Sequence, residues 1–192
     1  MKRLKEALSA AGIAYKENEP LCAHCTFRIG GQADLFVLPE NEEQLCAAIR
    51  LAKEAGVKSY LLGNGSNILF EDAGYRGAVI NVSAMKSGIG VIENISFPGK
   101  DPALTYDAVV VGAGQMLSSL CMAALENSLT GLEFAYGIPG TVGGAVYMNA
   151  GAYGGEMKDV LASVRYLTGE GEIVEAPAEQ LDLRYRHSIF EE

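Results

Sequence analysis

The spacing of apolar residues predicts a short helix and then a β-α-β unit in the first third of the chain. Residues 1–12 have helical spacing and too short an apolar run for a signal peptide, so we expect an amphipathic helix and a cytoplasmic protein. Residues 33–38 and 58–62 are apolar and predict strands. The helix between them should begin with a capping box of Asn41 and Gln44 and end at Gly56. Such a unit has parallel strands and a right-handed crossover.

The rest of the chain predicts more strand than helix. Residues 77–82 and 107–111 have strand-like apolar runs, and the segment 83–106 is expected to form an extended hairpin or loop. Residues 161–167 and 172–174 predict a second hairpin around a glycine-rich turn. One further helix is expected, with a buried face formed by Met116, Leu117, Leu120, Cys121, Ala124 and Leu125.

A long glycine-rich stretch at residues 131–160 interrupts this pattern. Positions 134–155 carry no charge, yet Pro139, Asn149 and repeated glycines make the stretch a poor helix. Glycine is needed where the backbone turns with positive φ or approaches another group closely. The stretch could therefore be a set of buried turns or backbone packed against a ligand. We favour the ligand, because cofactor sites combine apolar walls with a few placed polar groups.

A second glycine-containing turn, residues 63–67 (GNGSN), follows the predicted strand 58–62. Ligands of open α/β sheets bind beyond the carboxyl ends of strands, and small residues there can direct backbone N–H groups toward an oxyanion. The turn lacks the ending of a Walker loop and the third glycine of a dinucleotide fingerprint. An amide nest for a diphosphate and a plain polar turn are both open for this segment.

The composition is that of a soluble globular protein and limits the partners. The chain has 192 residues, 49% of them hydrophobic, and a net charge of −9, which argues against nucleic acid or an anionic membrane. Cys22 and Cys25 form a C-x-x-C, but the chain has too few further ligands for a zinc site, so no metal is expected. Cys46 and Cys121 fall on apolar helix faces and are expected to be buried thiols.

Five motifs, in order along the chain, resemble the UDP-N-acetylenolpyruvoylglucosamine reductase family. They are HCTFRIGGQAD at 24–34, LGNGSNIL at 62–69, VGAGQ at 111–115, GLEFAYGIPGTVGGAVYMNAGAYG at 131–154 and YRHSIF at 185–190. The fourth motif is long and highly specific. Cys25 stands where the family commonly has threonine, so the C-x-x-C is incidental in this interpretation.

The resemblance implies an α+β fold: the two-lobed FAD-binding fold of the vanillyl-alcohol-oxidase (PCMH) type. Residues 1–18 would be a helix and lead-in, residues 19–82 the first FAD-binding lobe with its β-α-β unit, and residues 83–192 a second lobe with antiparallel sheet. FAD would be held non-covalently between the lobes. The implied reaction uses NADPH as reductant and converts UDP-N-acetylglucosamine enolpyruvate to UDP-N-acetylmuramate, a peptidoglycan precursor.

The resemblance also implies the site residues. Arg186 matches the active-site arginine of a Y-R-x-S motif, where a fixed guanidinium would stabilise enolate charge, and Tyr185 matches its neighbour near the substrate. The cofactor-binding residues implied are Leu62, Gly63, Asn64, Gly65, Ser66, Asn67, Gly131, Ile138, Pro139, Gly140, Thr141, Gly143, Gly144, Ala145, Asn149, Gly151, Ala152 and Tyr153.

One departure from the family affects the functional interpretation. The family continues into a third lobe that binds the UDP-sugar and supplies a serine as general acid and a glutamate, and we expect this lobe to be absent from the 192 residues. Ser188 belongs to the Y-R-x-S motif and is not that serine. The chain is then the FAD-binding part of the reductase, incomplete for catalysis by itself. The alternative is a shortened, non-catalytic homologue that acts as a binding module, with or without flavin.

Overall fold

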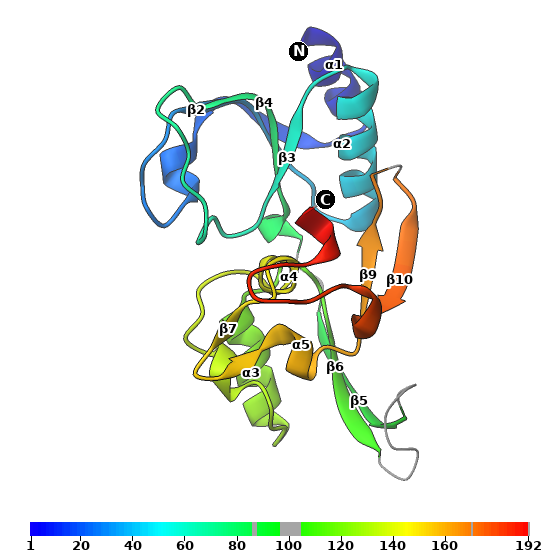
Figure 1. Cartoon of the computed structure of the whole chain (residues 1–192). Helices are drawn as coiled ribbons and strands as arrows, with labels where there is room; N and C mark the ends of the chain where they lie inside the picture. Colours follow the sequence, from blue (N-terminus) through cyan, green and yellow to red (C-terminus); the bar gives the residue numbers. More distant parts are fainter. Residues whose placement is uncertain (86–87, 97–104, 170, 192) are drawn as a thin grey trace. The chain divides into compact units, whose positions relative to one another are not determined.

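The computed structural model describes residues 1–85, 88–96, 105–169 and 171–191 (Figure 1). The chain forms two compact units. Unit 1 comprises Met1–Lys86 and Leu167–Glu172, and unit 2 comprises Ser87–Tyr166 and Ile173–Glu192. Each unit has its own hydrophobic core.

Unit 1 begins with the predicted amphipathic helix and then a strand that the sequence did not indicate. Helix α1 covers Lys2–Ala10 and buries Leu4 and Leu8. Strand β1, Ala14–Pro20, pairs antiparallel with β2. It was missed because its residues are mostly charged or polar, as edge strands often are.

The sheet of unit 1 contains the predicted parallel strands in an order that the sequence did not reveal. Strands β2 (Gln32–Leu38), β3 (Ser59–Leu62) and β4 (Tyr75–Asn81) form a four-stranded sheet with β1, in the order β1-β2-β4-β3. Both β2 and β3 run parallel to β4, which confirms the parallel prediction. The two strands of the predicted β-α-β unit are nevertheless not neighbours in the sheet, because β4 lies between β2 and β3.

Helix α2, Glu42–Glu54, begins and ends close to the predicted residues. Asn41 Oδ1 accepts a hydrogen bond from Gln44 N at 2.9 Å. Gln44 Oε1 accepts from Glu40 N rather than from Asn41 N, so the second half of the predicted capping box was wrong by one residue. Gly56, with φ +65°, ends the helix, and Val57 N donates to Ala52 O, a Schellman motif.

Replacing Asn41 with alanine is expected to lower the free energy of unfolding by about 1 kcal/mol, because the Gln44 amide loses its acceptor. Urea unfolding followed by circular dichroism measures the change. Gln44→Ala is the comparison, since it removes the bond to Glu40 but leaves the cap. An Asn41→Ala protein as stable as the wild type would show that the cap adds nothing.

Both faces of the unit 1 sheet are covered. Alternation along β2 and β4 places Leu35, Val37 and Ile80 against α1 and α2 on one face. The other face carries Phe36 and Val79, which pack with Leu21, Cys25, Leu62 and Phe70. This second core lies under the short 3-10 helix η1, Leu21–His24, and the loops that follow it.

Unit 2 opens with the predicted hairpin. Strands β5 (Ile89–Ile95) and β6 (Tyr106–Val111) pair antiparallel, and residues 97–104 of the predicted segment lie outside the described residues. Helix α3, Leu117–Glu126, buries most of the predicted face. The prediction was wrong for Leu125, which is 68% exposed, and Met116 is the half-buried residue before the helix.

The glycine-rich stretch forms short elements instead of one helix. It contains η3 (Glu133–Ala135), α4 (Val142–Tyr147), the two-residue strands β7 (Gly151–Ala152) and β8 (Gly155–Glu156), and α5 (Met157–Val160). The predicted second hairpin follows as β9 (Ser163–Leu167) and β10 (Ile173–Pro177). Across the described residues, no helix has the length and apolar character that crossing a membrane requires.

The four cysteines are free thiols in the structure. Cys121 is buried as predicted, and burial raises the pKa of its thiol. Cys46 is only half-buried, so the prediction of a buried thiol was wrong for this residue. The described residues contain no group of three or more histidine, cysteine, aspartate or glutamate side chains placed to hold a metal ion.

Candidate functional site

The turn at residues 63–67 is anchored through its carbonyl groups. Gly63 O accepts hydrogen bonds from Asn81 Nδ2 at 2.9 Å and from Ser83 Oγ at 3.4 Å. Gly65 O accepts from Thr26 N at 3.0 Å, and Ser66 O accepts from Thr26 Oγ1 at 3.4 Å. Three of the carbonyls in this turn therefore face the protein.

The anchored carbonyls fix the direction of the N–H groups that follow them. In a trans peptide the C=O of one residue and the N–H of the next point in opposite directions. The N–H groups of Asn64, Ser66 and Asn67 are thus directed away from the groups that hold the turn. Donors arranged in this way favour an anion, which is one of the two interpretations that the sequence left open for this segment.

Gly65 shows how tightly the turn is built. Its φ is +64°, and a Cβ at this position would lie 2.0 Å from His24 O and 2.9 Å from the Cα of Cys25. The turn can approach residues 24–26 only because position 65 has no side chain. The motifs HCTFRIGG and GNGSN, far apart in sequence, are therefore packed together within unit 1.

The residues that support this turn include a charged network around His24. Glu19 Oε1 lies 2.7 Å from Lys16 Nζ and 2.8 Å from His24 Nε2, and the ring of His24 stacks on Phe36 with centroids 4.0 Å apart. The hydrogen bonds from Lys16 and then His24 lower the pKa of the Glu19 carboxyl. The network holds the segment whose backbone contacts Gly65.

Replacing Glu19 with glutamine is expected to lower the free energy of unfolding at pH 7 by about 1 kcal/mol. Because the folded pKa of Glu19 lies below the unfolded value of about 4.3, its contribution is present above that pH and is lost as the pH falls through the folded pKa. The difference between wild type and variant should therefore become smaller as the pH falls below about 4.

Urea unfolding at pH 7, 5 and 3 measures this difference. Glu6→Gln is the control, since it removes an exposed carboxylate 4.0 Å from Lys2 Nζ and should change little at any of these pH values. A gap between wild type and Glu19→Gln that stays constant from pH 7 to pH 3 would contradict the prediction.

In unit 2 the structure brings the VGAGQ motif onto the glycine-rich stretch. Val142 N donates to Gln115 O at 2.8 Å, and Gly143 N donates to Ala113 O at 2.9 Å. A Cβ on Gly143 would lie 2.7 Å from the Cβ of Ala113. Thr141 is buried and caps α4 by accepting from Gly144 N at 3.3 Å. At these positions the chain's own packing accounts for the small residues.

The predicted cofactor residues of unit 2 range from fully exposed to buried. Pro139, Gly144 and Tyr153 are exposed, and Tyr153 is 96% exposed at the tip of the β7–β8 turn. Gly131 N donates to Glu133 Oε2 at 2.8 Å, so this amide is used within the chain. Five of the predicted residues are half-buried: Gly131, Ile138, Gly143, Gly151 and Ala152. Four are buried: Gly140, Thr141, Ala145 and Asn149.

Tyr185 and Arg186 form the tip of a tight turn. Arg184 N donates to His187 O at 3.2 Å, and His187 N donates to Arg184 O at 3.1 Å. Tyr185 is 84% exposed, and Arg186 has a φ of +56°. The Arg186 guanidinium contacts Met148 Sδ through Nη1 at 3.7 Å and is exposed, so its charge is available to an anionic ligand.

Sequence reasoning missed the side chains that hold these segments. Asn81 and Ser83 anchor Gly63, and Thr26 anchors Gly65 and Ser66. A signal was present for Asn81, because a polar residue that ends a buried strand beside a glycine turn is a candidate anchor. Thr26 could not be found in this way, since its partner is 39 positions or more along the chain.

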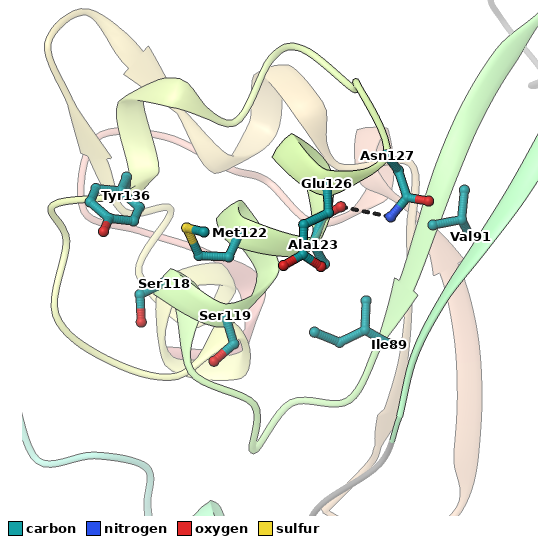
Figure 2. A pocket seen from close by; sticks show the side chains of 9 residues that line it. All are labelled: Ile89, Val91, Ser118, Ser119, Met122, Ala123, Glu126, Asn127 and Tyr136. Atoms are coloured by element: carbon teal, nitrogen blue, oxygen red, sulfur yellow. Dashed lines mark hydrogen bonds between the residues drawn. The ribbon is translucent and has the colours of Figure 1, made fainter.

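Unit 2 also has an open groove of about 600 Å³ beside α3 (Figure 2). Figure 2 shows Ser118, Ser119 and Met122 on α3 and Ile89 and Val91 on β5, with Glu126 and Asn127 near the end of the helix. Tyr136 completes the lining. None of these residues is among the predicted cofactor or substrate residues, although Tyr136 belongs to the glycine-rich stretch.

The mixed, helix-covered sheet of unit 1 and the antiparallel hairpins and short helices of unit 2 define the class: an α+β protein of two units. The chain belongs to the FAD binding domain family, whose sequence profile matches residues 33–177. The predicted α+β fold of the vanillyl-alcohol-oxidase type is confirmed. A VAO-type flavoprotein from Myceliophthora thermophila aligns over 78% of this chain and 27% of its own, with a TM-score of 0.62 and 18% identity.

The relatives are UDP-N-acetylenolpyruvoylglucosamine reductases. That of Agathobacter rectalis is 44% identical over 100% of this chain and 60% of its own length, and that of Syntrophomonas wolfei is 45% identical over 92% and 55%. The crystal structure of the Thermus caldophilus reductase aligns over 92% of this chain and 56% of its own, with a TM-score of 0.65 and 30% identity. The chain thus spans little more than half the length of the relatives it matches.

Proposed function

We propose that this chain is the FAD-binding part of a UDP-N-acetylenolpyruvoylglucosamine reductase. The observation that carries the proposal is the 44% identity to such a reductase across the whole chain. The direction of the Asn64, Ser66 and Asn67 N–H groups, away from the groups that anchor the turn, supports it, because a diphosphate is bound by such donors.

The residues fit FAD in two places. The turn Gly63–Asn67, which follows Leu62, would hold the diphosphate through its amides. The exposed and half-buried backbone of the glycine-rich stretch would lie along the flavin, because few side chains there obstruct a flat ring. Bound FAD supplies two-electron hydride chemistry, which side chains cannot perform unaided.

Arg186 is the residue that we assign to the substrate. The proposed reaction reduces the enolpyruvyl double bond of UDP-N-acetylglucosamine enolpyruvate, with NADPH as reductant, and gives UDP-N-acetylmuramate and NADP⁺. Hydride adds to one carbon, a proton adds to the other, and negative charge develops on the carboxylate side. The exposed guanidinium at the tip of the turn would stabilise that charge, with Tyr185 beside the substrate.

The proton donor must come from elsewhere. Ser188 is fully buried and its hydroxyl donates to Tyr147 O, so it cannot reach a substrate carbon. We propose that the relatives' additional length supplies the donor and the sugar-binding lobe, in agreement with the partial coverage of the relatives. The alternative function is a flavin-binding module without reductase activity.

The first test is an absorption spectrum of the chain after incubation with FAD and removal of the excess. Flavin bands that stay with the protein, and are released by denaturation, are expected for a non-covalent site. Loss of the bands on adding NADPH would favour the reductase over the binding module. A chain that retains no flavin at saturating FAD would contradict the proposal that these two units build the site.

A further inference from the structure

Asn149 is buried at the junction between two segments of the proposed site. It follows α4 in the glycine-rich stretch, is 2% exposed and has a φ of +43°. The resemblance implies a role in cofactor binding for this residue. Its side chain, however, is fully engaged inside unit 2.

All of the hydrogen-bonding groups of this amide point at the chain. Asn149 Nδ2 donates to Glu156 Oε2 at 2.6 Å and to Arg184 O at 3.0 Å, which uses both of its N–H groups. Asn149 Oδ1 accepts from Lys158 N at 2.9 Å. No donor of this side chain is left for a cofactor.

The bond to Arg184 O reaches the turn that presents Arg186. The same carbonyl closes the turn by accepting from His187 N at 3.1 Å. On the other side of the turn, the buried Ser188 hydroxyl donates to Tyr147 O, at the end of α4. The turn is therefore attached on both sides to the end of α4 and the residues that follow it.

We propose that Asn149 is a positioning residue that fixes the Arg184–His187 turn, and with it the Arg186 guanidinium, relative to the glycine-rich stretch. An effect of Asn149 on catalysis rests on the proposed function, because that function assigns substrate binding to Arg186. The attachment of the turn by Asn149 is independent of the proposed function. A merely structural asparagine would stabilise unit 2 without a particular effect on this turn.

Two variants separate these roles. In Asn149→Asp an acceptor replaces the Nδ2 donor and faces the acceptors Glu156 Oε2 and Arg184 O, so both bonds are lost. Adding Glu156→Gln returns a donor to position 156, and the 149–156 hydrogen bond can form with reversed direction. Arg184 O still receives no donor from position 149, so the double variant should recover part of the stability but not the turn.

The measurements are hydrogen exchange of the Arg184 and His187 amides by NMR and unfolding in urea, on the 192-residue chain. Asn149→Asp should speed exchange of these two amides about tenfold, which corresponds to about 1.4 kcal/mol. The double variant should recover part of the loss in the unfolding midpoint, since Glu156→Gln also gives up the ion pair with Lys158 Nζ at 3.0 Å, and should keep the fast exchange. Asn127→Ala, which removes a side-chain bond from Nδ2 to Ala123 O at 2.8 Å, is the matched control and should leave the turn unchanged.

Exchange at wild-type rates in Asn149→Asp, or recovery of both properties in the double variant, would overturn the inference. If Asn149→Asp does not fold, Asn149→Gly carries the same test, since glycine accepts the positive φ and has no donor. Failure of the proposed function appears differently. Turnover that is insensitive to Arg186→Ala would refute the role of Arg186 while the exchange result for Asn149 stands.

Discussion

Gly65→Ala is expected to destabilise unit 1 by about 3 kcal/mol and to abolish FAD binding. The new methyl group would lie 2.0 Å from His24 O, and the φ of +64° adds left-handed strain. The turn must then move away from residues 24–26, and the row of N–H groups at 63–67 loses its alignment. Urea unfolding and titration with FAD measure the two effects.

Gly56→Ala is the matched control for this prediction. Its φ of +65° is nearly the same, but a Cβ there has no atom within 4 Å. It should therefore show the strain alone, about 1 kcal/mol, and keep FAD binding. Equal losses in the two variants would mean that the close approach to His24 does not hold the turn.

Arg186→Ala is expected to lower reductase turnover by about 100-fold or more. Removal of one donor to a developing oxyanion typically lowers kcat by roughly 10²–10³. The assay joins this chain to the C-terminal part of the Agathobacter rectalis relative and follows NADPH oxidation. FAD binding by the variant should be unchanged, because Arg186 is a substrate residue in this proposal. Arg186→Lys should recover only part of the rate, because lysine lacks the planar fork.

Arg184→Ala is the control for the charge of the same turn. Its guanidinium is paired with Asp182 Oδ2 at 2.6 Å, so it is not directed to a substrate. The Arg184 backbone, which closes the turn, stays in place in this variant. A loss of turnover in Arg184→Ala as large as in Arg186→Ala would show that general charge, and not the position of Arg186, matters.

The sequence predicted local elements well because their signals are local. Apolar spacing and Asn41 located α2, and the glycine turn after β3 was found by its place after an apolar strand. The order of the strands was not predictable, because the insertion of β4 between β2 and β3 depends on contacts distant in sequence. Strand β1 was missed because its residues are mostly polar or charged and show no alternation of apolar and polar positions.

The candidate site was predicted in its segments but not in the roles of single residues. Of the two interpretations of the glycine-rich stretch, buried packing is confirmed at some positions, and backbone packed against a ligand stays a prediction at the others. Gly143 is required by contact with Ala113, whereas Gly137 is exposed, has no neighbour within 4 Å and is not required by the chain's own packing. In the sequence, the amide of Asn149 suits a ligand as well as it suits a bond within the chain. Only its three internal hydrogen bonds distinguish ligand binding from positioning of the turn.

The position of β4 has a consequence for synthesis on the ribosome. In the described sheet, β4 is the only strand that pairs with β3. Among the described strands, it is also the only one that pairs with β2 in parallel. A nascent chain that has emerged only as far as residue 74 can form the β1–β2 pair and α2, but β3 has no strand to join. Vectorial folding of this sheet therefore waits for residues 75–81, and until then Leu62 and Phe36 lack Val79, which packs in the same core.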